Sequence, residues 1–516
     1  MSFFSTWAKE AKWEPTIVVN GETIKFKPTP RLLGVILDRQ LNFGPQVETL
    51  REKLSPKYRM LSAISNTKWG WRKEDLMKVY LAHFNSVINY AGFAWQPSTA
   101  ESHIESLERL QNRALRIVTG QYQSSPTEAL RREVGMPSIQ TQVKRNAVKA
   151  AEKSLRLPDD HPRAIAFNTS VANPRNKRQS WRSLTEDIKG QLPAGMENRC
   201  TISYFDHEPW LSAPNLEVFP LLYNIKRTDP EEEKKSAALQ RIREVDASTT
   251  IYTDGSADAG IFEGGSAVVV THGDPASPTV TTSIQRKGAP FTCSYEEEVD
   301  AMIAATAWIR DNIKDGSSTM ICTDSQSLCQ ALESFNLETE AIRRNAADCS
   351  GAIVLQWIPG HSAIPGNDLA DAEAKAATEL GTVKREVSFR SACTMVKRTY
   401  KDVSSHPRTA KVYRHFSKEK EKTEIDNRAD QVTVAQLRTG HHKSLKAYAH
   451  RLDDSVDPTC EECREEPHTL EHWFERCSST SAFRQQLFGG ETEKDIGLLT
   501  KCPKESVALA RKSLRD

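Results

Sequence analysis

The sequence predicts a multidomain protein built around an α/β sandwich with a mixed, five-stranded sheet. The first observation is length, because 516 residues suffice for about three domains of about 100–200 residues each. The second is a change of pattern at residue 249, where three β-rich runs begin and are followed by alternating helical and strand patterns. The third is that helical periodicity precedes this part, whereas cysteines crowd together behind it. A mainly helical region before the sandwich and a small cysteine-rich segment after it complete the predicted fold class.

The composition is that of an ordinary globular protein, with 38% hydrophobic and 27% charged residues. The 70 Lys and Arg nearly cancel the 68 Asp and Glu and leave a net charge of +2. This balance excludes a bulk polycation, so any binding of nucleic acid has to come from locally segregated charge. The sequence has neither a run of about 18 apolar residues nor a signal peptide. We therefore expect an intracellular protein without a membrane partner, its compartment (nucleus or cytoplasm) being left open.

The first expected elements are a hairpin and three helices. Two β-rich runs between Thr16 and Lys27 flank Asn20-Gly21, the favoured pair for a type I′ turn. Apolar residues then recur at three- and four-residue intervals over 46–65, 73–91 and 101–119, as in an amphipathic bundle. From residue 157 to 245 this periodicity fails and Pro, Asn, Asp and Arg accumulate, which predicts a linker.

The sandwich is expected to follow the linker. Its strands are predicted at 249–254, 264–271, 279–285, 319–324 and 352–358. One helix is predicted from Tyr295 to Ile313, two between the last two strands, and one from about Gly366. The predicted domains are a helical region (1–156), the linker (157–245), the sandwich (246–382), a basic helical connector (383–455) and a cysteine-rich tail (456–516).

Four carboxylates occupy positions at which such a sheet places its chemistry. Asp254 and Asp324 end the first and fourth strands, and open α/β sheets form their sites at the carboxyl ends of strands. Glu298 stands in the opening turns of the first helix, and Asp371 lies in the last helix. Singly, each has an ordinary explanation as a turn former or as a partner of the helix dipole. Together they would repel one another without hard cations, which predicts two Mg²⁺ or Mn²⁺ ions about 4 Å apart, suited to phosphodiester hydrolysis.

A histidine lies between two of these carboxylates in the sequence. His361 stands on a Gly- and Pro-rich loop that joins the last strand to the last helix. A loop histidine is often merely solvated, but here it could shuttle a proton for the predicted metal site.

Four motifs carry a resemblance to a known family. They are Tyr252-Thr-Asp-Gly-Ser, Tyr295-Glu-Glu-Glu-Val, Cys322-Thr-Asp-Ser-Gln, and Trp357-Ile-Pro-Gly-His with Asn367-Asp-Leu-Ala-Asp. In this order they resemble the signatures of type 1 ribonuclease H over about 246–382. The resemblance implies endonucleolytic cleavage of the RNA strand of RNA–DNA hybrids, giving 5′-phosphate and 3′-hydroxyl ends. It implies as metal ligands Asp254, Glu298, Asp324 and Asp371, with His361 assisting product departure.

Two details of this resemblance concern the first helix. In the family the metal-binding Glu precedes an aliphatic residue, so Glu298 before Val299 fits better than Glu296 or Glu297. The family's Asn-rich segment before that Glu is replaced here by Cys293-Ser-Tyr. Hybrid specificity requires contacts with 2′-hydroxyls across the minor groove and with phosphates. The residues placed for such contacts, with solvated turn positions as the alternative, are Ser256, Ser294 and Gln326.

The cysteine cluster predicts a structural Zn²⁺ site. Cys460 and Cys463, followed by His472 and Cys477, give a C-x2-C-x8-H-x4-C pattern suited to tetrahedral zinc. His468 is a competing ligand, and unpaired thiols are the alternative explanation. The segment resembles the zinc-finger-like tail behind ribonuclease H in some non-LTR retrotransposon polyproteins, which implies nucleic-acid binding. An upstream basic face is expected to assist it, formed by Arg438, His441, His442, Lys443, Lys446 and Arg451.

Apolar motifs of the amino-terminal region resemble the segment downstream of the catalytic palm in non-LTR reverse transcriptases. They begin at Leu32, Val87 and Leu110, and they imply a thumb and connection region over about 25–150. The aromatic-x-Asp-Asp hairpin of a polymerase is absent, so we expect no polymerase activity and interpret the chain as the carboxyl-terminal piece of a retroelement polyprotein.

The sequence thus predicts a metal-dependent endoribonuclease acting on RNA–DNA hybrids, with attached nucleic-acid-binding modules and an unspecified oligomeric state. One alternative is a catalytically inactive, nucleic-acid-binding remnant of a retroelement, which the retained carboxylates and His361 disfavour. The other is a nuclease of the integrase or transposase type, which the order Asp, Glu, Asp, Asp disfavours.

Overall fold

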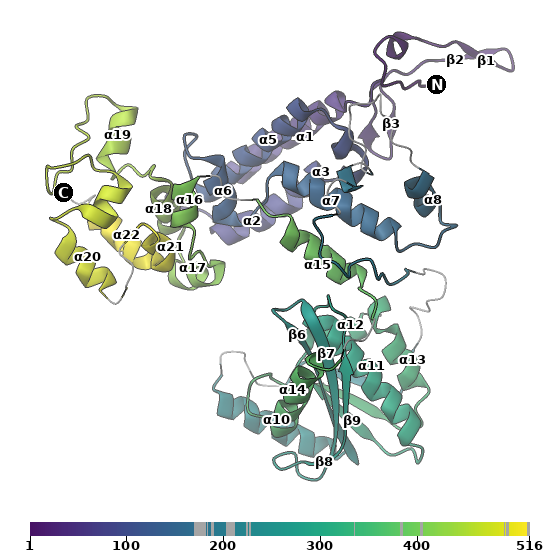
Figure 1. Ribbon diagram of the computed structural model, residues 1–516. Coiled ribbons are helices and arrows are strands. Elements are labelled where there is room, and N and C mark those ends of the chain that lie inside the picture. Colours follow the sequence, from purple (N-terminus) through teal and green to yellow (C-terminus); the bar gives the residue numbers. More distant parts are fainter. Residues whose placement is uncertain are drawn as a thin grey trace. The chain divides into compact units, whose positions relative to one another are not determined.

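The computed structural model describes most of the chain and divides it into two compact units (Figure 1). The helical unit comprises Met1–Ala147, Ala172–Glu186 and Tyr400–Asp516, and the sheet unit comprises Val148–Val171 and Asp187–Thr399. The residues described are 1–169, 182, 184–186, 190–202, 212–222, 225, 229–334, 336–381, 385–402, 406–489, 491 and 495–512.

The sheet unit contains one mixed sheet of six strands in the order β5-β10-β9-β6-β7-β8. The neighbours β6, β7 and β8 pair antiparallel, whereas β6, β9, β10 and β5 pair parallel. All five predicted strands are present, and the mixed sheet is confirmed. The strands are β5 (Leu216–Phe219), β6 (Thr249–Asp258), β7 (Phe262–His272), β8 (Thr279–Lys287), β9 (Thr319–Thr323) and β10 (Ile353–Trp357).

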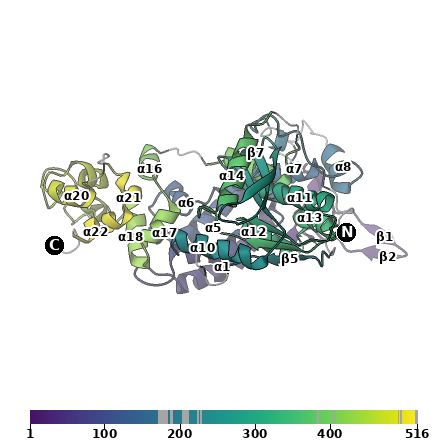
Figure 2. The ribbon, with the colours of Figure 1, turned by 90° about the horizontal axis from the view of Figure 1, so that it is seen from below.

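Helices cover both faces of this sheet (Figures 1 and 2). Ile251 and Ile321 contact the layer of α11, α12 and α13, whereas their neighbours Tyr252 and Cys322 contact the layer of α10 and α14. This alternation is the period of two that a strand buried on both faces requires. The helices are α10 (Glu231–Val245), α11 (Ser294–Asn312), α12 (Gln326–Glu333), η4 (Leu337–Thr339), α13 (Glu340–Ala347), α14 (Pro365–Thr378) and α15 (Phe389–Thr399), and α8 (Pro162–Thr169) belongs to the same unit.

The range predicted as a linker contains regular structure and adds a sixth strand to the sheet. Strand β5 pairs in parallel with β10 and forms one edge of the sheet, and α10 buries Ala238, Leu239 and Ile242 against the sheet. Burying the apolar stripe of α10 removes these side chains from water and so stabilises the packing of the helix on the sheet. Residues 170–181 and 203–211 of the predicted linker lie outside the described residues.

The amino-terminal part of the helical unit begins with the predicted hairpin. Strands β1 (Ile17–Val19) and β2 (Glu22–Ile24) pair antiparallel around Asn20 and Gly21, which have φ of 50° and 83°. Positive φ at both central positions defines a type I′ turn and confirms the prediction. The other elements are η1 (Glu10–Lys12), β3 (Arg31–Leu32), β4 (Val35–Ile36), α1 (Gly44–Ala63), α2 (Lys73–Tyr80), η2 (Leu81–Asn85), α3 (Ser86–Ile88), α4 (Gly92–Trp95), η3 (Gln96–Ser98), α5 (Glu101–Thr119), α6 (Thr127–Val134) and α7 (Ile139–Ser154).

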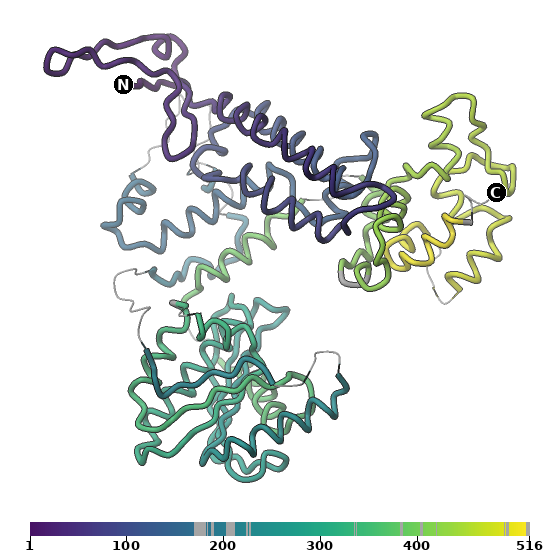
Figure 3. Tube along the Cα trace, turned by 180° about the vertical axis from the view of Figure 1, so that it is seen from behind, coloured from purple at the N-terminus to yellow at the C-terminus, as the bar shows by residue number. Residues whose placement is uncertain are grey.

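Helices α1 and α5 lie side by side (Figures 1 and 3). Their predicted ranges agree closely with the structure, whereas the helix expected over 73–91 becomes α2, the wider-turned η2 and the short α3. The helix ends there because Ala91 has φ of 49°, which helical backbone does not allow.

The carboxyl-terminal part of the helical unit shares its core with the amino-terminal part. Ala129 of α6 belongs to the same apolar cluster as Leu437, Trp473 and Leu499. The elements are α16 (Pro407–Val412), α17 (Lys418–Glu424), α18 (Arg428–Thr439), α19 (Lys446–Leu452), η5 (His472–Arg476), α20 (Ser481–Phe488), α21 (Leu498–Lys501) and α22 (Pro503–Lys512). In the described residues no helix combines the length and the hydropathy that spanning a bilayer requires.

Four buried charged residues join these two parts, and we call them the ionic cluster. They are Lys73 of α2, Glu133 of α6, Glu421 of α17 and Arg438 of α18. Lys73 Nζ lies 2.8 Å from Glu133 Oε1 and also pairs with Glu421, and Arg438 Nη1 lies 2.8 Å from Glu133 Oε1 and 2.7 Å from Glu421 Oε2. The Arg438 side chain is 0% exposed. Two cations and two anions thus compensate one another without water.

Candidate functional site

The carboxylates of the sheet unit converge because β6 and β9 are parallel neighbours. Tyr252 pairs with Cys322 and Thr253 with Thr323, so Asp254 and Asp324 follow at the same edge of the sheet. Strand periodicity directs both side chains toward the α14 face. Glu298 reaches them from the second turn of α11. Carboxylate oxygens of Asp254, Glu298 and Asp324 lie within 4.8 Å of one another, and we call these residues the acidic triad.

Gly255 permits this approach of strand and helix. A Cβ atom at Gly255 would lie 2.2 Å from the Glu298 backbone nitrogen and 2.4 Å from the Glu297 carbonyl carbon. Both are backbone atoms, which cannot move aside as a flexible side chain would. The first turns of α11 therefore pack directly on the strand that carries Asp254.

Replacing Gly255 by Ala is expected to lower the free energy of unfolding of the sheet unit by about 2 kcal/mol or more, because α11 has to shift away from β6. Urea unfolding followed by circular dichroism measures the loss. Gly381→Ala is the matched control, since a Cβ there meets nothing within 4 Å. Equal midpoints for the two variants would contradict the close packing.

Burial and mutual repulsion disfavour charge on the acidic triad. Burial, with Asp324 and Asp371 nearby, raises the pKa of Asp254 to about 7. Burial raises the pKa of Glu298 well above its usual range, and Asp254 and Asp324 add to the shift. Burial also raises the pKa of Asp324, although the amide of Asn367 and His361 oppose the rise. A site that penalises three negative charges is suited to a positively charged ligand.

The three consecutive glutamates have different surroundings. Glu296 accepts a hydrogen bond from the Cys293 N–H at 3.4 Å and hydrogen bonds from Ser388 and Ser391. Glu297 accepts a hydrogen bond from Thr292 Oγ1 at 2.8 Å, and its carboxyl group lies beside Gly264 and Gly288. Glu298 alone of the three joins the acidic triad, and its Oε2 is buried without a hydrogen-bond partner.

Asp371 and His361 line the same cleft as the acidic triad. The cleft has a volume of about 230 Å³. Asp371 Oδ2 accepts a hydrogen bond from Lys375 Nζ at 2.6 Å, one turn further along α14. His361 lies on the loop before α14 with φ of 51°. The cleft is lined by Asp254, Gly255, Ser256, Ala257, Ser294, Glu298, Asp324, His361, Asn367, Asp368 and Asp371.

Two further residues of α14 serve this site and were not among the expected ones. The buried Asn367 donates a hydrogen bond to Asp324, and Lys375 pairs with Asp371. Asn367, Asp371 and Lys375 recur every fourth residue, so they share one face of the helix. This spacing is visible in the sequence and could have identified both residues.

The three residues expected to contact the substrate do not all line the cleft. Ser256 and Ser294 line the cleft, whereas Gln326 does not. Gln326 is the first residue of α12. Its Nε2 donates a hydrogen bond at 3.4 Å to the carbonyl of Pro220, the residue that follows the sixth strand β5 in sequence. A role of these residues in substrate binding stays a prediction.

The cysteine cluster of the helical unit closes into a compact set of four donors. Cys460 Sγ lies 3.9 Å from Cys477 Sγ, and Cys463 Sγ lies 3.3 Å from His472 Nε2. Donor atoms of all four lie within 4.8 Å of one another. His468 is not part of this set; burial lowers its pKa to about 4, and its ring packs against Trp473.

Three of the six residues expected to form a basic face upstream of this cluster are buried, whereas Lys443 and Arg451 are exposed. Arg438 is buried in the ionic cluster, and Lys446 pairs with Glu461 at 2.8 Å. His441 and His442 are buried, and burial lowers the pKa of each to about 4, so both are neutral near pH 7. The acids that pair with Arg438 are Glu133 and Glu421, and nothing near Arg438 in the sequence points to Glu133.

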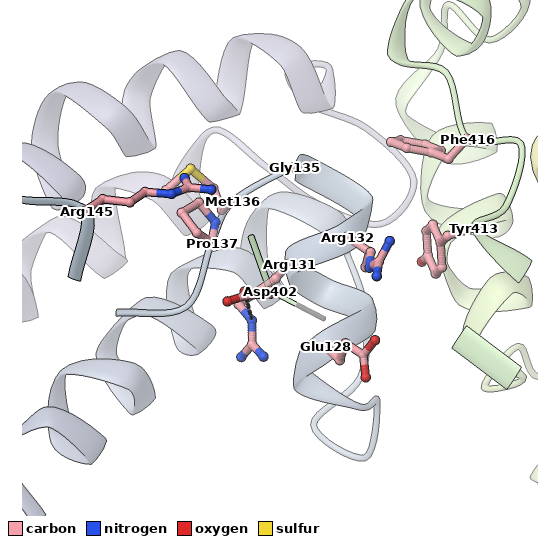
Figure 4. Close-up of a pocket in the computed structure, with 10 residues that line it drawn as sticks. All are labelled: Glu128, Arg131, Arg132, Gly135, Met136, Pro137, Arg145, Asp402, Tyr413 and Phe416. Carbon is pink, nitrogen blue, oxygen red and sulfur yellow. Dashed lines mark ion pairs between the residues drawn. The ribbon is translucent and has the colours of Figure 1, made fainter. Parts of the chain in front are cut away.

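Another cavity of the helical unit holds charged residues that serve the fold (Figure 4). It has a volume of about 300 Å³ between α6, the start of α7 and α16. Asp402 lies 3.4 Å from Arg131 Nε and accepts hydrogen bonds from the Ser138 N–H at 2.7 Å and Ser138 Oγ at 2.9 Å. Arg145 donates to the Tyr400 carbonyl at 2.7 Å. These contacts fix the turn between α6 and α7 and assemble no catalytic group.

Comparison with known proteins identifies the sheet unit. Residues 246–379 match the RNase H family. A Retrovirus-related Pol polyprotein from type-1 retrotransposable element R1 4 of Nasonia vitripennis is 30% identical over 144 residues, covering 28% of this chain and 36% of the relative. An RNA-directed DNA polymerase from mobile element jockey of Drosophila funebris is 23% identical over 162 residues, covering 31% of this chain and 17% of the relative. The chain therefore spans well under two thirds of either relative.

Two solved structures are similar to part of the chain. RNase H1 of Halobacterium salinarum NRC-1 is 19% identical with a TM-score of 0.21, covering 25% of this chain and 96% of that one. The PFV RNase H domain is 18% identical with a TM-score of 0.21, covering 26% of this chain and 94% of that one. The family match and the mixed sheet flanked by helices together establish that the chain carries an RNase H domain and is related to retrotransposon polyproteins.

Proposed function

We propose that the chain hydrolyses the RNA strand of RNA–DNA hybrids with two divalent metal ions at the acidic triad and Asp371. The observation that carries the proposal is the convergence of three carboxylates within 4.8 Å at the ends of two parallel strands, with Asp254 and Glu298 buried and Asp324 half-buried. The RNase H family match over these residues supports it.

The residues present fit divalent cations. Glu298 Oε2 is buried without a hydrogen-bond partner, and burial together with like charges raises the pKa of all three carboxyl groups. Oxygen donors of this kind are what Mg²⁺ and Mn²⁺ prefer. The ions, when bound, activate a water and stabilise the charge that develops on the scissile phosphate.

The protein side chains divide the remaining work. Asp254 and Asp324 would hold the ions at the strand ends, Glu298 would complete the set from α11, and Asp371 would contribute from α14. Asn367, through its hydrogen bond to Asp324, fixes the orientation of that carboxylate. His361, on its loop, would carry a proton to or from the leaving oxygen. Ser256 and Ser294 would donate hydroxyl hydrogen bonds to the hybrid.

A cleavage assay of the full chain tests this function. Labelled RNA–DNA hybrid, RNA duplex, DNA duplex and single-stranded RNA are incubated with Mg²⁺ and, separately, with EDTA. Cleavage confined to the RNA of the hybrid and dependent on Mg²⁺ is expected. Asp324→Asn is expected to abolish it, whereas Asp258→Asn, at the exposed end of the same strand as Asp254, is the matched control. Uncut hybrid, or unchanged activity of Asp324→Asn, would reject the proposal and favour an inactive remnant.

We further propose that Cys460, Cys463, His472 and Cys477 hold one structural Zn²⁺. Three thiolates and one imidazole nitrogen within 4.8 Å of one another form a donor set suited to zinc. Glu466 Oε2 lies 3.3 Å from the other ring nitrogen, Nδ1 of His472, where a carboxylate orients a zinc-binding imidazole.

The assignment of residues 25–150 to a thumb and connection region, and the predicted domain limits, stay predictions.

Cys477→Ser is expected to remove stoichiometric zinc and to lower the melting temperature of the helical unit by about 10 °C or more, because zinc binding contributes directly to folding. Elemental analysis of protein purified without chelator and calorimetry measure the two effects. Cys502→Ser, a cysteine of the same unit outside the cluster, should retain the metal. Folded wild-type protein without zinc would refute the site.

A further inference from the structure

The helical unit contains a groove whose lining is basic and contains no acidic side chain. We call it the arginine groove; it has a volume of about 450 Å³ and lies between the carboxyl-terminal ends of α1 and α5. Three guanidinium groups line it, from Arg113, Arg116 and Arg428, together with hydroxyl and amide side chains. Every lining residue belongs to the helical unit.

The two arginines of α5 are held in place without carboxylates. The guanidinium of Arg113 lies 4.4 Å from the centre of the Tyr58 ring. Arg116 Nη2 donates to the carbonyls of Gln123 at 3.3 Å and Ser125 at 3.5 Å, and its Nε is buried without an acceptor. Within the described part of the chain, neither arginine has an ion-pair partner. Burial lowers the pKa of Arg116, as expected for a cation that lacks an anion.

Two other arginines on α1 and α5 have carboxylate partners. Arg51 of α1 lies 3.7 Å from Glu48, and Arg109 of α5 lies 3.8 Å from Glu105. Arg428 donates hydrogen bonds to the carbonyls of Asn66, Ile117 and Val118, and the last two lie near the carboxyl-terminal end of α5. Among the cations that line the groove, Arg113 and Arg116 are those we expect to take an anion. In a chain with a net charge of +2, this is local segregation of positive charge.

Exposed aromatic rings stand beside this charge. The loop that supplies Ser65–Thr67 to the groove continues into Trp69 and Trp71, which are 56% and 52% exposed. The loop is kept tight by a bridge between Ser65 and Gly70, and by a hydrogen bond from the Trp71 N–H to the Ile64 carbonyl at 3.0 Å. Tyr122, which lines the groove, is 38% exposed, and its ring centre lies 5.7 Å from that of Tyr448. Cations next to exposed aromatic rings match a chain of phosphates that carries unstacked bases.

We propose that the arginine groove is a binding site for single-stranded nucleic acid, with phosphates on Arg113 and Arg116 and bases stacked on Trp69, Trp71 and Tyr122. The ligand is a single strand, because in a duplex the base faces are already stacked and unavailable to the rings. Ser62 and Thr67, both exposed at the rim, would donate to phosphate oxygens. This site lies outside the nuclease cleft, so it adds a strand-binding function to the proposed hydrolase.

Binding of fluorescent 20-nucleotide single strands tests the proposal. The full chain is used in an Asp324→Asn background without added divalent metal and without chelator, so that cleavage does not contribute and zinc bound at the cysteine cluster is retained. Arg113→Gln/Arg116→Gln is expected to weaken binding about tenfold at physiological salt and to reduce the salt-dependence slope by about 1.4, the value for two lost phosphate contacts. Arg51→Gln/Arg109→Gln also removes two positive charges, one from α1 and one from α5, and should leave both quantities near those of the parent.

Two further variants separate the proposal from loss of folding and from other ligands. Ser62→Glu places a negative charge on an exposed residue of the groove and should weaken binding without lowering the melting temperature. Trp69→Ala/Trp71→Ala should weaken binding to single strands while leaving the salt slope unchanged. Equal affinities of the two arginine pairs, equal binding of duplex DNA, or displacement by poly-glutamate as effective as by nucleic acid would each overturn the proposal. None of these outcomes bears on hybrid cleavage, which is measured separately with Mg²⁺.

Discussion

Asp254→Asn is expected to slow hybrid cleavage by at least about 1,000-fold while making the metal-free protein more stable. The loss of activity follows because Asp254 contributes a carboxylate at the centre of the acidic triad. The gain in stability follows because burial and the nearby Asp324 and Asp371 raise the pKa of Asp254 to about 7. At pH 8 the ionised carboxylate is therefore a cost to the folded state, and the neutral amide removes that cost, worth about 1–3 kcal/mol.

The sign of this effect can be checked against pH. A carboxyl group whose pKa is higher in the folded than in the unfolded state destabilises the fold as pH rises between the two values, here from about 4 to about 7. Urea unfolding in EDTA at pH 5 and pH 8 should therefore show a larger gain for Asp254→Asn at pH 8. The matched control is Asp258→Asn, at the exposed end of the same strand. A variant that is less stable than wild type at pH 8, or that still cleaves hybrid at the wild-type rate, would contradict the assignment.

Arg438→Met is expected to lower the free energy of unfolding of the helical unit by about 3–5 kcal/mol. Arg438 compensates Glu133 and Glu421 and donates to the Leu499 carbonyl at 3.1 Å, all in the buried interior. Methionine fills a similar volume but leaves Lys73 as the one cation of the ionic cluster against two carboxylates. Calorimetry of the full chain measures the loss as a shift of the transition that the zinc variants also affect.

Arg414→Met is the matched control for this change. Arg414 lies 3.4 Å from Asp495 in a half-exposed ion pair, and such pairs contribute about 0–1 kcal/mol. Equal losses for the two variants would show that burial of the ionic cluster has no energetic consequence. A folded, fully stable Arg438→Met protein would show that Lys73 alone suffices.

The ionic cluster also predicts sensitivity to acid. Burial alone would raise the pKa of Glu421, but Arg438 and Lys73 overcome it and lower that pKa to about 2. The resulting stability is fully present above the unfolded value near 4.5 and is lost as pH falls from about 4.5 toward about 2. Glu421→Gln should flatten this loss in a thermal scan between pH 5 and pH 3. An unchanged pH dependence in that variant would exclude Glu421 as its source.

Local pattern was sufficient to predict the sheet and most of its acidic residues. Strand runs with turn residues at their ends located Asp254 and Asp324, and the neighbouring positions of β6 and β9 follow from the usual topology of such sheets. The sixth strand β5 could not be found in this way, because four residues next to Pro220 show no period of their own. It forms because the edge of β10 offers unpaired backbone groups.

Long-range pairing limited the remaining predictions. The basic run from Arg438 to Arg451 reads as a charged surface, yet Arg438 is buried because acids about 300 and 17 residues away in sequence meet it. Gln326 follows Asp324 closely in sequence, but the start of α12 directs its amide to Pro220. Neither outcome can be predicted from neighbouring residues in the sequence, because each depends on which distant segments the fold brings together.

The discontinuous make-up of the helical unit has a consequence for synthesis on the ribosome. The ionic cluster needs Lys73 and Glu133 from the first part of the chain and Glu421 and Arg438 from the last. The amino-terminal helices therefore emerge from the ribosome with Lys73 and Glu133, each of which lacks part of its final set of partners. More than 250 residues of intervening chain (134–420) are made before those partners follow. The sheet, whose strands all lie between residues 216 and 357, is complete before then. The strands of the sheet can thus pair while the unit that brackets them in sequence is still incomplete.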